Sequence, residues 1–588
     1  MAATLLARPV HDPQDVGDLL QQRLENREYI HKAAVDAFNG KQVPFPLGQE
    51  LMRLCVVHGI RYHADFSFGP AAVLRGSLPL FTRTLNARAI MSNQIPDLDL
   101  DHPDDLPYCI WYPDVPSGDT LRDLARRYPF MAYHAARACA VAGYTDVYKE
   151  IAQTANLLPE VAIAEEARES GCLDIFNLIM DAPVRYKVFD DYALTVNTSA
   201  PKPAFLNADT AVRPYLQERQ KFSTPFGLPS DEGTGAELAD ADALFMYESS
   251  RGFIEPTFNI TEDMSIDLVG DDGMIEAIKK VAPPADEAAL ELFCQPLPAD
   301  LTTCHKDLLI LMAAYNGDID RYHRLRRSRL IDTEIQCIIR GIYHNSLFAQ
   351  WWKTQPFPDD YERDIRKAIS ARGVMNNDLS YILSPQGAEP RLIWYPSVAH
   401  PAAYETLARV KPSMRHAVAR AAIYANYQSL FDKLVQGDGD DGGSAPVVPD
   451  YELLNEARRS HNAHYRETLE RIAAERQADV SQRRPDPLVQ DLRSAMLSFF
   501  VRKGDRVPRL RVGTNTGPGD PYTVYNGMEC DAAGVEMYLS IPDGWRLPLP
   551  EGFDSPLTID GDTLLEYDYK IWPPGFEETA ASMDDKGS

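Results

Sequence analysis

Ile110-Trp111-Tyr112-Pro113 is the stretch of this sequence that decides its fold, because it occurs twice. It returns as Ile393-Trp394-Tyr395-Pro396, 283 positions further along the chain. The match then runs on without a gap through further identical residues, which in the first copy are Leu124, Ala125, Arg126, Pro129, Met131, Ala136, Arg137, Ala138, Ala142 and Tyr144. An internal repeat of this kind predicts stacked copies of one supersecondary unit.

Two further blocks extend the match on either side. Upstream, residues 87–93 (ARAIMSN) match residues 371–377 (ARGVMNN) at an offset of 284. Downstream, residues 166–170 (EARES) match residues 456–460 (EARRS) at an offset of 290. The second copy gains its extra residues in the GDGDDGG stretch at 437–443, and a loop accepts such an insertion at a small entropic cost. The sequence therefore predicts two related halves, at about 50–185 and 304–480.

The repeated unit carries the start and stop signals of helical hairpins. A polar start at residues 117–119 precedes a periodic run at 120–127, which is typical of a helix N-terminus. Pro129 then opens an alanine-rich stretch at 130–141, and proline is tolerated in the first turn of a helix. Gly143 is placed to cap that helix in the left-handed conformation. A third helix is expected around Val147 to Ala152, since its apolar residues recur at three- and four-residue spacing.

The clearest hairpin is Leu311 to Tyr322 (LMAAYNGDIDRY), which resembles the inner-helix, turn and outer-helix stretch of an ankyrin repeat. Further candidates are residues 136–151, 166–179, 338–352, 419–434 and 456–472. The repeat spacing is irregular, and the T-P-L-H opening of a standard ankyrin repeat does not occur. The chain therefore resembles degenerate ankyrin-repeat-like helical-hairpin proteins over about half of its length, and is similar to uncharacterised large fungal proteins of that type. The resemblance implies a mainly α fold, a helical solenoid, and no particular activity.

The composition favours some partners over others. With 59 basic and 86 acidic residues the formal net charge is −27, so nucleic-acid backbones and anionic membranes are unfavourable partners. A basic protein is the electrostatically natural partner, although an acidic surface also serves simply to keep a large protein in solution. We expect no nucleic-acid and no membrane partner.

Cysteine usage and hydropathy indicate the compartment. The eight cysteines are scattered and form no Cys-x-x-Cys pair, which fits a reducing compartment and argues against a compact zinc site. The N-terminus lacks the apolar core of a secretory signal, and no run of 18 apolar residues occurs. We expect a cytoplasmic protein, with the nucleus as the other option.

Outside the two halves the sequence changes character. Proline-rich and acidic segments mark an insert that carries two candidate short strands, 258–260 and 265–268. One helix is expected near Leu19 to Ala37. The resulting domain prediction is a lead-in at 1–46, a first array at 47–185, an insert at 186–303, a second array at 304–480, a helix plus β-rich cap at 481–576 and a disordered tail at 577–588.

The cap is predicted from alternating apolar residues. Val535, Met537, Leu539 and Ile541 alternate with polar residues, as do Leu565, Tyr567, Tyr569 and Ile571. A period of two is typical of half-buried strands, and the Asn526-Gly527 and Asp560-Gly561 pairs suit hairpin turns. We expect a small antiparallel β region that covers the end of the second array.

Several patterns look like chemistry but have simpler interpretations. Residues 437–442 spell G-x-G-x-x-G, yet they follow a helix and carry three aspartates, so a linker is favoured over a dinucleotide site. Residues 97–101 (DLDLD) lack the glycine and glutamate that a calcium loop needs, which favours a solvated acidic loop. His461 and His464, with His416 elsewhere, lack the H-E-x-x-H pattern and are taken as surface histidines.

Two other features have both a structural and a functional interpretation. The arginines of the 321–329 segment are either a phosphate- or acidic-peptide-binding patch or, as we favour, an outer helix paired with local carboxylates. The Trp111-Tyr112 and Trp394-Tyr395 pairs are either exposed interface anchors or, as we favour, wedges that pack one hairpin onto the next.

We predict a protein–protein interaction scaffold, since solenoids present extended surfaces and no catalytic motif occurs. No catalytic, cofactor-binding or metal-binding residue is assigned, no cofactor is expected, and the oligomeric state is left open. The alternative is an enzyme or small-ligand binder with a pocket between the two halves and the 186–303 insert. The insert residues that would converge on such a cleft are Tyr186, Asp190, Asp191, Tyr192 and Arg213.

Overall fold

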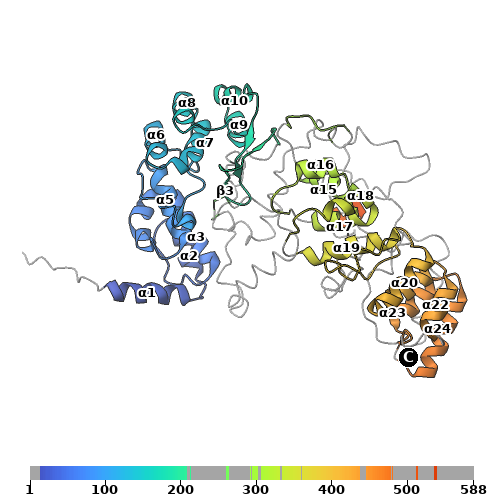
Figure 1. Ribbon diagram of the computed structural model, residues 1–588. Helices are drawn as coiled ribbons and strands as arrows, with labels where there is room; N and C mark the ends of the chain where they lie inside the picture. Colours follow the sequence, from blue (N-terminus) through green and yellow to red (C-terminus); the bar gives the residue numbers. More distant parts are fainter. Residues whose placement is uncertain are drawn as a thin grey trace, which may run out of the picture. The chain divides into compact units, whose positions relative to one another are not determined.

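The computed structural model is mainly helical and carries a few short antiparallel strands (Figure 1). It describes residues 13–207, 212, 260–261, 263, 292, 295–301, 306–330, 334–358, 361–437, 445–478, 480, 511–513 and 536–538. The chain divides into two compact units, which we call unit 1 (residues 1–306 and 325–332) and unit 2 (residues 307–324 and 333–588). No helix among the described residues is long and apolar enough to cross a membrane.

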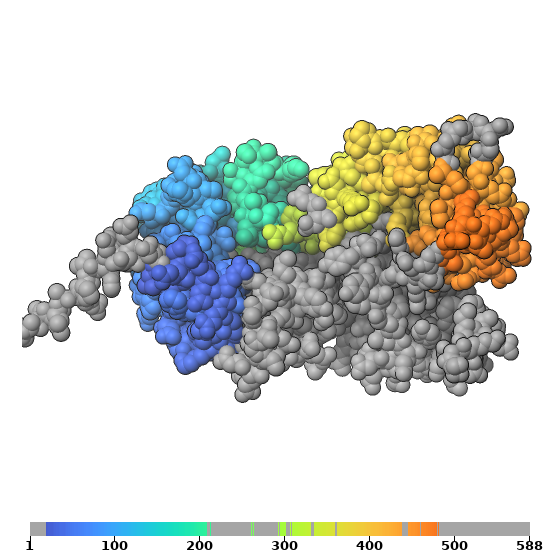
Figure 2. Space-filling view, turned by 90° about the horizontal axis from the view of Figure 1, so that it is seen from below, coloured from blue at the N-terminus to red at the C-terminus, as the bar shows by residue number. Residues whose placement is uncertain are grey.

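Unit 1 begins with a succession of antiparallel helical pairs. Its helices are α1 (Pro13–Glu25), α2 (His31–Phe38), α3 (Glu50–Tyr62), α4 (Ala64–Phe68), α5 (Pro79–Met91), α6 (Gly118–Arg127), α7 (Ala132–Ala142), α8 (Thr145–Thr154), α9 (Val161–Glu169) and α10 (Leu173–Met180). Short 3-10 turns occur at Pro70–Leu74, Pro103–Asp105 and Pro129–Met131. In the space-filling view the blue, light-blue and green parts of this unit pack against one another (Figure 2).

Unit 2 has a closely similar order of helices. They are α15 (Lys306–Asn316), α16 (Ile319–Leu325), α17 (Glu334–His344), α18 (Ser346–Trp352), α19 (Glu362–Met375), α20 (Pro401–Val410), α21 (Arg415–Tyr424), α22 (Gln428–Gln436), α23 (Tyr451–Arg459) and α24 (Ala463–Arg476). A 3-10 turn at Pro412–Met414 precedes α21, as Pro129–Met131 precedes α7. The helical hairpins expected at 311–322, 338–352, 419–434 and 456–472 are confirmed as helix pairs.

The helix ends follow the sequence signals. Ser117 caps α6 by accepting a hydrogen bond from the Thr120 amide at 3.3 Å, which satisfies one of the helix's free donors. Gly143 ends α7 with φ of 75°, and Gly317 separates α15 from α16 with φ of 68°, a conformation that glycine adopts without strain. The predicted boundaries of these helices are confirmed to within a few residues.

Two glycines inside helices allow unusually close packing at matching places. A Cβ on Gly59 of α3 would lie 2.1 Å from the Ala37 carbonyl oxygen, and one on Gly341 of α17 would lie 2.1 Å from that of Ala314. The next contact in each case is a phenylalanine ring, Phe66 in unit 1 at 2.9 Å. Helix α3 can approach α2, and α17 can approach α15, this closely only because the side chain is missing.

The tryptophans of the repeated motif are wedges, as favoured from the sequence. Trp111 and Trp394 are 0% and 1% exposed, and both lie in the loop that leads to the next helical pair. The peptide bonds Tyr112-Pro113 and Tyr395-Pro396 are both cis. Each tyrosine ring meets a ring from the end of the facing helix edge-on, Tyr112 with Tyr62 at 6.2 Å and Tyr395 with His344 at 5.6 Å. The motif therefore packs one helical pair onto the next in each unit.

The strands of unit 1 follow α10. β1 (Tyr186–Lys187) pairs antiparallel with β4 (Lys202–Pro203), and β2 (Phe189–Asp190) pairs antiparallel with β3 (Thr195–Val196). In unit 2, β5 (Arg511–Gly513) pairs antiparallel with β6 (Glu536–Tyr538), so Met537 of the first alternating run does lie in a strand. The rest of that run, the second alternating run, both predicted hairpin turns and the polar tail lie outside the described residues.

One sequence expectation near the start of unit 1 is wrong. The helix expected near Leu19 to Ala37 is two helices, α1 and α2, with a break at residues 26–30. There Asn26 turns the chain by accepting the Glu28 amide on its side chain at 2.8 Å, a local bond that competes with helix continuation. In the insert, Ile260 lies in a bend and not in a strand. The remainder of the two candidate insert strands lies outside the described residues.

The two ends of the insert are tied together within unit 1. Arg185 pairs with Asp300 at 3.1 Å, and the same carboxylate accepts the Leu206 amide at 2.9 Å. The Leu301 amide donates to the Leu206 carbonyl at 2.9 Å, and Asn207 forms a parallel bridge with Leu301. Residues 206–207 and 300–301, at the two ends of the insert, are thus neighbours in unit 1.

Candidate functional site

The most prominent polar cluster of unit 1 surrounds Arg137, which the alanine-rich helix α7 carries into the core. Its guanidinium group binds both oxygens of Asp191, with Nη1 at 2.6 Å and Nη2 at 2.9 Å. Nη2 also contacts Glu166 Oε2 of helix α9 at 3.2 Å. The three side chains are 0 to 1% exposed. A forked, charge-assisted pair of this geometry is the arrangement that offsets the cost of burying charges.

Aromatic side chains complete the Arg137 cluster. The guanidinium carbon lies 4.8 Å from the Trp111 ring and 4.9 Å from the Phe189 ring, within cation–π range. Tyr108 donates a hydrogen bond to Asp191 at 2.7 Å. Burial and the Asp191 carboxylate raise the pKa of Tyr108 well above its ordinary value, so this phenol is a permanent donor.

Unit 2 builds a related cluster around Arg420 of helix α21. Arg420 lies 5.0 Å from the Trp394 ring and binds Glu452 of helix α23 at 3.0 Å, with Glu456 at 3.8 Å. Arg391 reaches the same Glu452 carboxylate at 2.5 Å. Arg420 is 1% exposed, whereas Arg391 is 36% exposed.

The two clusters use matching positions with different residues. Trp111 and Arg137 correspond to Trp394 and Arg420 at the offset of 283, and Glu166 corresponds to Glu456 at the offset of 290. The principal carboxylate differs: unit 1 takes Asp191 from the hairpin that follows, while unit 2 takes Glu452 from within α23 itself. The further donor to that carboxylate is Tyr108 in unit 1 and Arg391 at the matching position in unit 2.

The N-caps of α9 and α23 also occupy matching positions. Glu160 accepts the Ile163 amide at 2.8 Å and, through its other oxygen, the Val188 and Phe189 amides at 3.2 and 3.4 Å. It therefore ties α9 to the strand that covers Arg137. Burial raises the pKa of Glu160 to about 7, against the effect of these three amide donors.

Asp450, the matching N-cap in unit 2, has the opposite electrostatic setting. It accepts the Leu453 amide at 2.9 Å and binds His416 Nε2 at 2.8 Å. Burial alone would raise the pKa of Asp450, but the hydrogen bond and charge of His416, the Leu453 amide and the charge of Arg420 together outweigh it and hold that pKa below its usual range.

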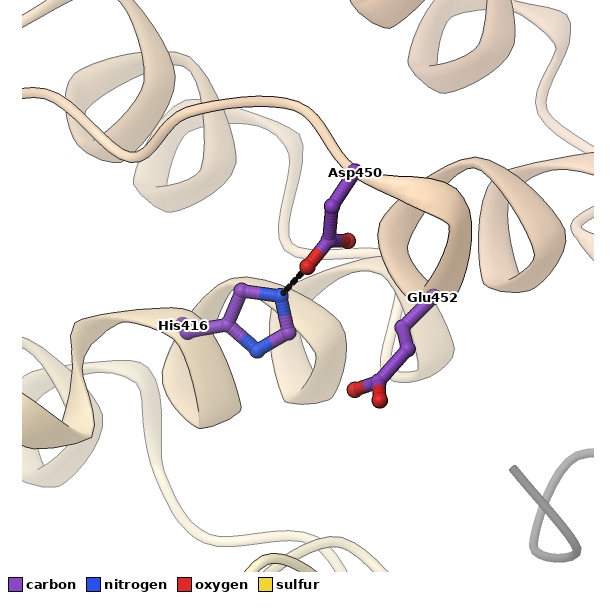
Figure 3. Close-up of side chains that lie close together, drawn as sticks. All are labelled: His416, Asp450 and Glu452. Carbon is purple, nitrogen blue, oxygen red and sulfur yellow. Dashed lines mark hydrogen bonds and ion pairs between the residues drawn. The ribbon is translucent and has the colours of Figure 1, made fainter. Parts of the chain in front are cut away.

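His416, Asp450 and Glu452 lie close together and offer three possible metal ligands (Figure 3). Their bonding argues against that use. Both oxygens of Glu452 bind guanidinium groups, those of Arg391 and Arg420, and a cation placed there would meet two positive charges. The cluster has the chemistry of a salt-bridge network that fixes the start of α23.

Two open pockets lie in unit 2 at the turns between helices. One, of about 720 Å³, is lined by Ile423, Tyr424, Asn426, Ser460, His461 and Asn462. The other, of about 590 Å³, is lined by Asn377, Leu379, His400, Ala402, Ala403 and Thr406. The lining of the first pocket is mostly polar, whereas that of the second is more apolar, with Leu379, Ala402 and Ala403 among its residues.

The histidines and arginines singled out in the sequence lie in separate places. His416 binds Asp450, His464 binds Asp432 at 2.7 Å, and His461 lines the larger pocket. Arg321 pairs with Asp318 at 3.4 Å, as the favoured interpretation expects. Arg327 instead lies over the Tyr192 ring at 5.1 Å. The acidic loop at 97–101 is tied back through an ion pair between Asp97 and Arg127.

The insert residues proposed to line a cleft make local contacts in unit 1. Asp191 is buried against Arg137, Asp190 caps the turn between β2 and β3, and Tyr186 lies in β1. Arg213 lies outside the described residues. The two pockets above are lined by other side chains.

Sequence analysis missed the cluster although its signal was present. Arg137 and Glu166 both matched residues of the second copy at their own offsets, yet they were not recognised as partners of each other. A charged residue retained in an alanine-rich helix of both copies was the available signal, because buried arginines need a carboxylate.

A family model described as the YKP1 C-terminal domain matches residues 111–213. No curated protein and no solved structure matches the chain. The matched stretch begins at Trp111 and includes Arg137, Glu166 and Asp191. It ends directly after Val212, whose amide donates to Glu166 at 2.8 Å. The similarity to this family therefore includes Arg137, its two carboxylate partners and both of its aromatic contacts, Trp111 and Phe189, but not Tyr108.

Proposed function

We propose that the chain is an intracellular protein–protein interaction scaffold built from two related arrays of ankyrin-like helical hairpins. The matching contacts of the two units support a duplicated array. They include the two glycine approaches, the two cis Tyr-Pro bonds, the paired tryptophan and arginine, and the matching N-caps. A set of such local correspondences is the expectation for stacked copies of one unit.

The observation that carries the proposal is a row of hydrogen-bonded turns in unit 2. Asn345 donates to the Gly317 carbonyl at 3.1 Å, and Asn376 donates to Ser346 at 2.9 Å. Asn377 accepts the His400 amide at 2.6 Å. Each bond joins one turn to a neighbouring turn or helix start.

The row continues to the last helical pair. Tyr427 donates to the Ala399 carbonyl at 3.2 Å, and Asn462 donates to Asn426 at 3.0 Å. The two pockets open along this row, next to Asn377 and Asn426. The row is thus a fixed, polar surface with hollows, which suits recognition of another protein better than it suits chemistry.

Two ionisable groups with strong pKa shifts, Glu160 and Tyr108, also support a binding role over a catalytic one. Glu160 and Tyr108 lie in the core and hold one segment on the next. Neither lines either of the two pockets. A catalytic acid or base needs access to substrate, so these groups support structural roles.

The partner we propose is a protein with a positively charged surface, because the chain's net charge of −27 favours it. Long-range attraction between such partners weakens as salt screens it.

The test is retention of proteins from native lysate by the immobilised full-length chain, washed at low and at high salt. The variant Ala402→Trp fills the smaller pocket from an exposed position. The matched control, Ala474→Trp, adds the same bulk at an exposed position of α24 that lines neither pocket. We expect one stoichiometric basic protein that the wild type and the control retain, that Ala402→Trp loses, and that high salt releases. Equal retention by both variants would contradict the proposed surface, and no protein above background would contradict the scaffold.

A further inference from the structure

Ser328 is an exposed serine that lies among the arginines of the 321–329 segment. It is hydrogen-bonded to the β2–β3 hairpin, which covers Arg137. Helix α16 ends at Leu325, and residues 326–330 are irregular. This stretch reads Arg326-Arg327-Ser328-Arg329. Ser328 is exposed and belongs to the segment 325–332, which is part of unit 1.

Two contacts hold this segment on the tip of the β2–β3 hairpin. Ser328 Oγ donates a hydrogen bond to Asp190 Oδ1 at 2.9 Å. The same carboxylate oxygen accepts the Tyr192 and Ala193 amides at 3.1 and 3.2 Å, which fixes the turn of the hairpin. Next to it, the Arg327 guanidinium carbon lies 5.1 Å from the Tyr192 ring centre.

We propose that Ser328 is a phosphorylation site for an arginine-directed protein kinase, and that its phosphorylation releases residues 326–330 from the β2–β3 hairpin. The inference is independent of the proposed scaffold function.

The surroundings of Ser328 are those that such a kinase recognises. Arginines lie one, two and four positions before the serine, at Arg327, Arg326 and Arg324. Charge patterns of this kind set the substrate choice of many kinases. Ser328 and Arg329 are exposed and residues 326–330 are irregular, so the backbone here can be extended into an active site without unfolding a helix. The γ-phosphoryl group of ATP would pass to Ser328 Oγ as its bond to the β-phosphate oxygen breaks, with ADP leaving and the hydroxyl proton passing to the kinase base.

The phosphate would reverse the sign of the contact with Asp190. The hydroxyl donates to the carboxylate, whereas a phosphoserine carries about −1.5 to −2 charges at neutral pH and has acceptor oxygens only. Two anions would then face one another at the hairpin tip. The phosphate would also compete with the Tyr192 ring for the Arg327 guanidinium group. Both effects act against the docked segment.

A change at Ser328 can reach the buried Arg137 cluster because its partner Asp190 is next to Asp191 in the sequence. Asp190 accepts the Ser328 hydroxyl, and its neighbour Asp191 binds Arg137 in the core. Phe189, on the other side of Asp190, lies over the same arginine. A weakened turn at Asp190 would therefore loosen the strand that covers Arg137.

The first experiment treats the full-length chain with ATP and an arginine-directed kinase and maps the phosphate by mass spectrometry. We expect label at Ser328, its loss in Ser328→Ala, and about tenfold slower labelling in Arg326→Ala, which removes one recognition charge. Label elsewhere only, or equal labelling of Arg326→Ala, would overturn the proposed site.

The second experiment measures hydrogen exchange of residues 186–196. We expect about tenfold faster exchange in Ser328→Glu than in Ser328→Ala, since both lose the donor but only one adds a negative charge. Asp190→Asn added to Ser328→Glu should restore slow exchange, because the amide keeps an acceptor oxygen and removes the repulsion. Equal exchange in Ser328→Glu and Ser328→Ala, or no rescue by Asp190→Asn, would overturn the release.

Discussion

Arg137 and Arg420 occupy matching places in the two units, yet their charges are balanced in different ways. Arg137 depends on Asp191, a residue of a hairpin that lies outside the helical pairs. Arg420 depends on Glu452, the second residue of helix α23, and shares it with Arg391. The two units have in common the arginine, its tryptophan and a second carboxylate, Glu166 or Glu456. The principal carboxylate comes from different places, provided that it reaches the guanidinium group.

This difference has an energetic consequence. The unit 1 cluster is fully buried, and its charges have little access to water. In unit 2, Glu452 is 10% and Arg391 36% exposed. Unpaired charges cost more where water cannot reach them, so equivalent substitutions should be more damaging in unit 1.

The largest effect is expected where the units agree most closely. Gly59→Ala and Gly341→Ala would each place a Cβ 2.1 Å from a backbone carbonyl oxygen of a neighbouring helix, α2 and α15 respectively. Backbone cannot move aside as a side chain can, so we expect each to lower the free energy of unfolding by about 3 kcal/mol or more. Denaturant titration of both variants measures this. Gly118→Ala, whose Cβ would meet a movable valine methyl at 3.0 Å, is the control and should cost below about 1 kcal/mol. A large loss of stability in only one of the two glycine variants would contradict the close correspondence of the two units.

Arg137→Met and Arg420→Met compare the two clusters directly. Arg137→Met leaves Asp191 and Glu166 buried without their cation, and we expect a loss of about 4 kcal/mol. Arg420→Met leaves Glu452 still bound to Arg391, so about 2 kcal/mol is expected. Hydrogen exchange of the core amides of α7 and α21 reports each unit by itself. Equal losses would mean that solvent access does not distinguish the clusters.

The matching N-caps should give opposite responses to pH. The folded-state pKa of Glu160 is about 7, raised from 4.5 by burial. The contribution of Glu160 to the free energy of unfolding is therefore fully present below about pH 4.5. It falls by roughly 3 kcal/mol as the pH rises to about 7. The pKa of Asp450 is lowered, so its contribution is present above the ordinary aspartate pKa and is lost as pH falls.

Stability measured against pH, by exchange of the α9 and α23 amides, tests this contrast. Glu160→Gln should abolish the loss between pH 4.5 and 7 in α9 and leave α23 unchanged. Asp450→Asn should abolish the loss of stability of α23 at acid pH and leave α9 unchanged. The same trend in both helices would refute the electrostatic difference between the caps.

The smallest effects on stability are expected for Tyr108 and Arg391, the further donors to the principal carboxylates. Tyr108→Phe removes a buried hydrogen bond to Asp191, and we expect a loss of about 1.5 kcal/mol that salt does not change. Arg391→Met removes a partly exposed ion pair, for which below about 1 kcal/mol is expected, shrinking further at high salt. Unfolding titrations at two salt concentrations separate the two. A salt-sensitive Tyr108→Phe would indicate that the unit 1 cluster is wetter than its burial implies.

The helices could be predicted from the sequence because local signals fix them. Gly143, Ser117 and Pro129 mark helix ends through backbone conformation and capping, which depend on a few neighbouring residues. The buried positions of Trp111 and Trp394 followed from their place beside apolar residues. These features are encoded within one hairpin.

The partners of the arginines could not be predicted, because they come from distant or unmatched positions. Asp191 lies 54 residues beyond Arg137, in a hairpin with no counterpart in the matched blocks. Glu452 stands where the first copy has Ala162. The break between α1 and α2 depends on one asparagine side chain that bonds locally, which apolar periodicity does not reveal.

The tied ends of the insert have a consequence for protein engineering. Since the Leu301 amide already bonds the Leu206 carbonyl, residues 207 and 301 are spatial neighbours whatever lies between them. A few glycines and serines would span that junction, and a shorter closed loop costs the chain less entropy. The same junction would accept a reporter domain whose own termini are adjacent. Unit 1 thus contains a splice point, provided that the exchanged sequence keeps or replaces Val212 and Ile260, which are buried in its core.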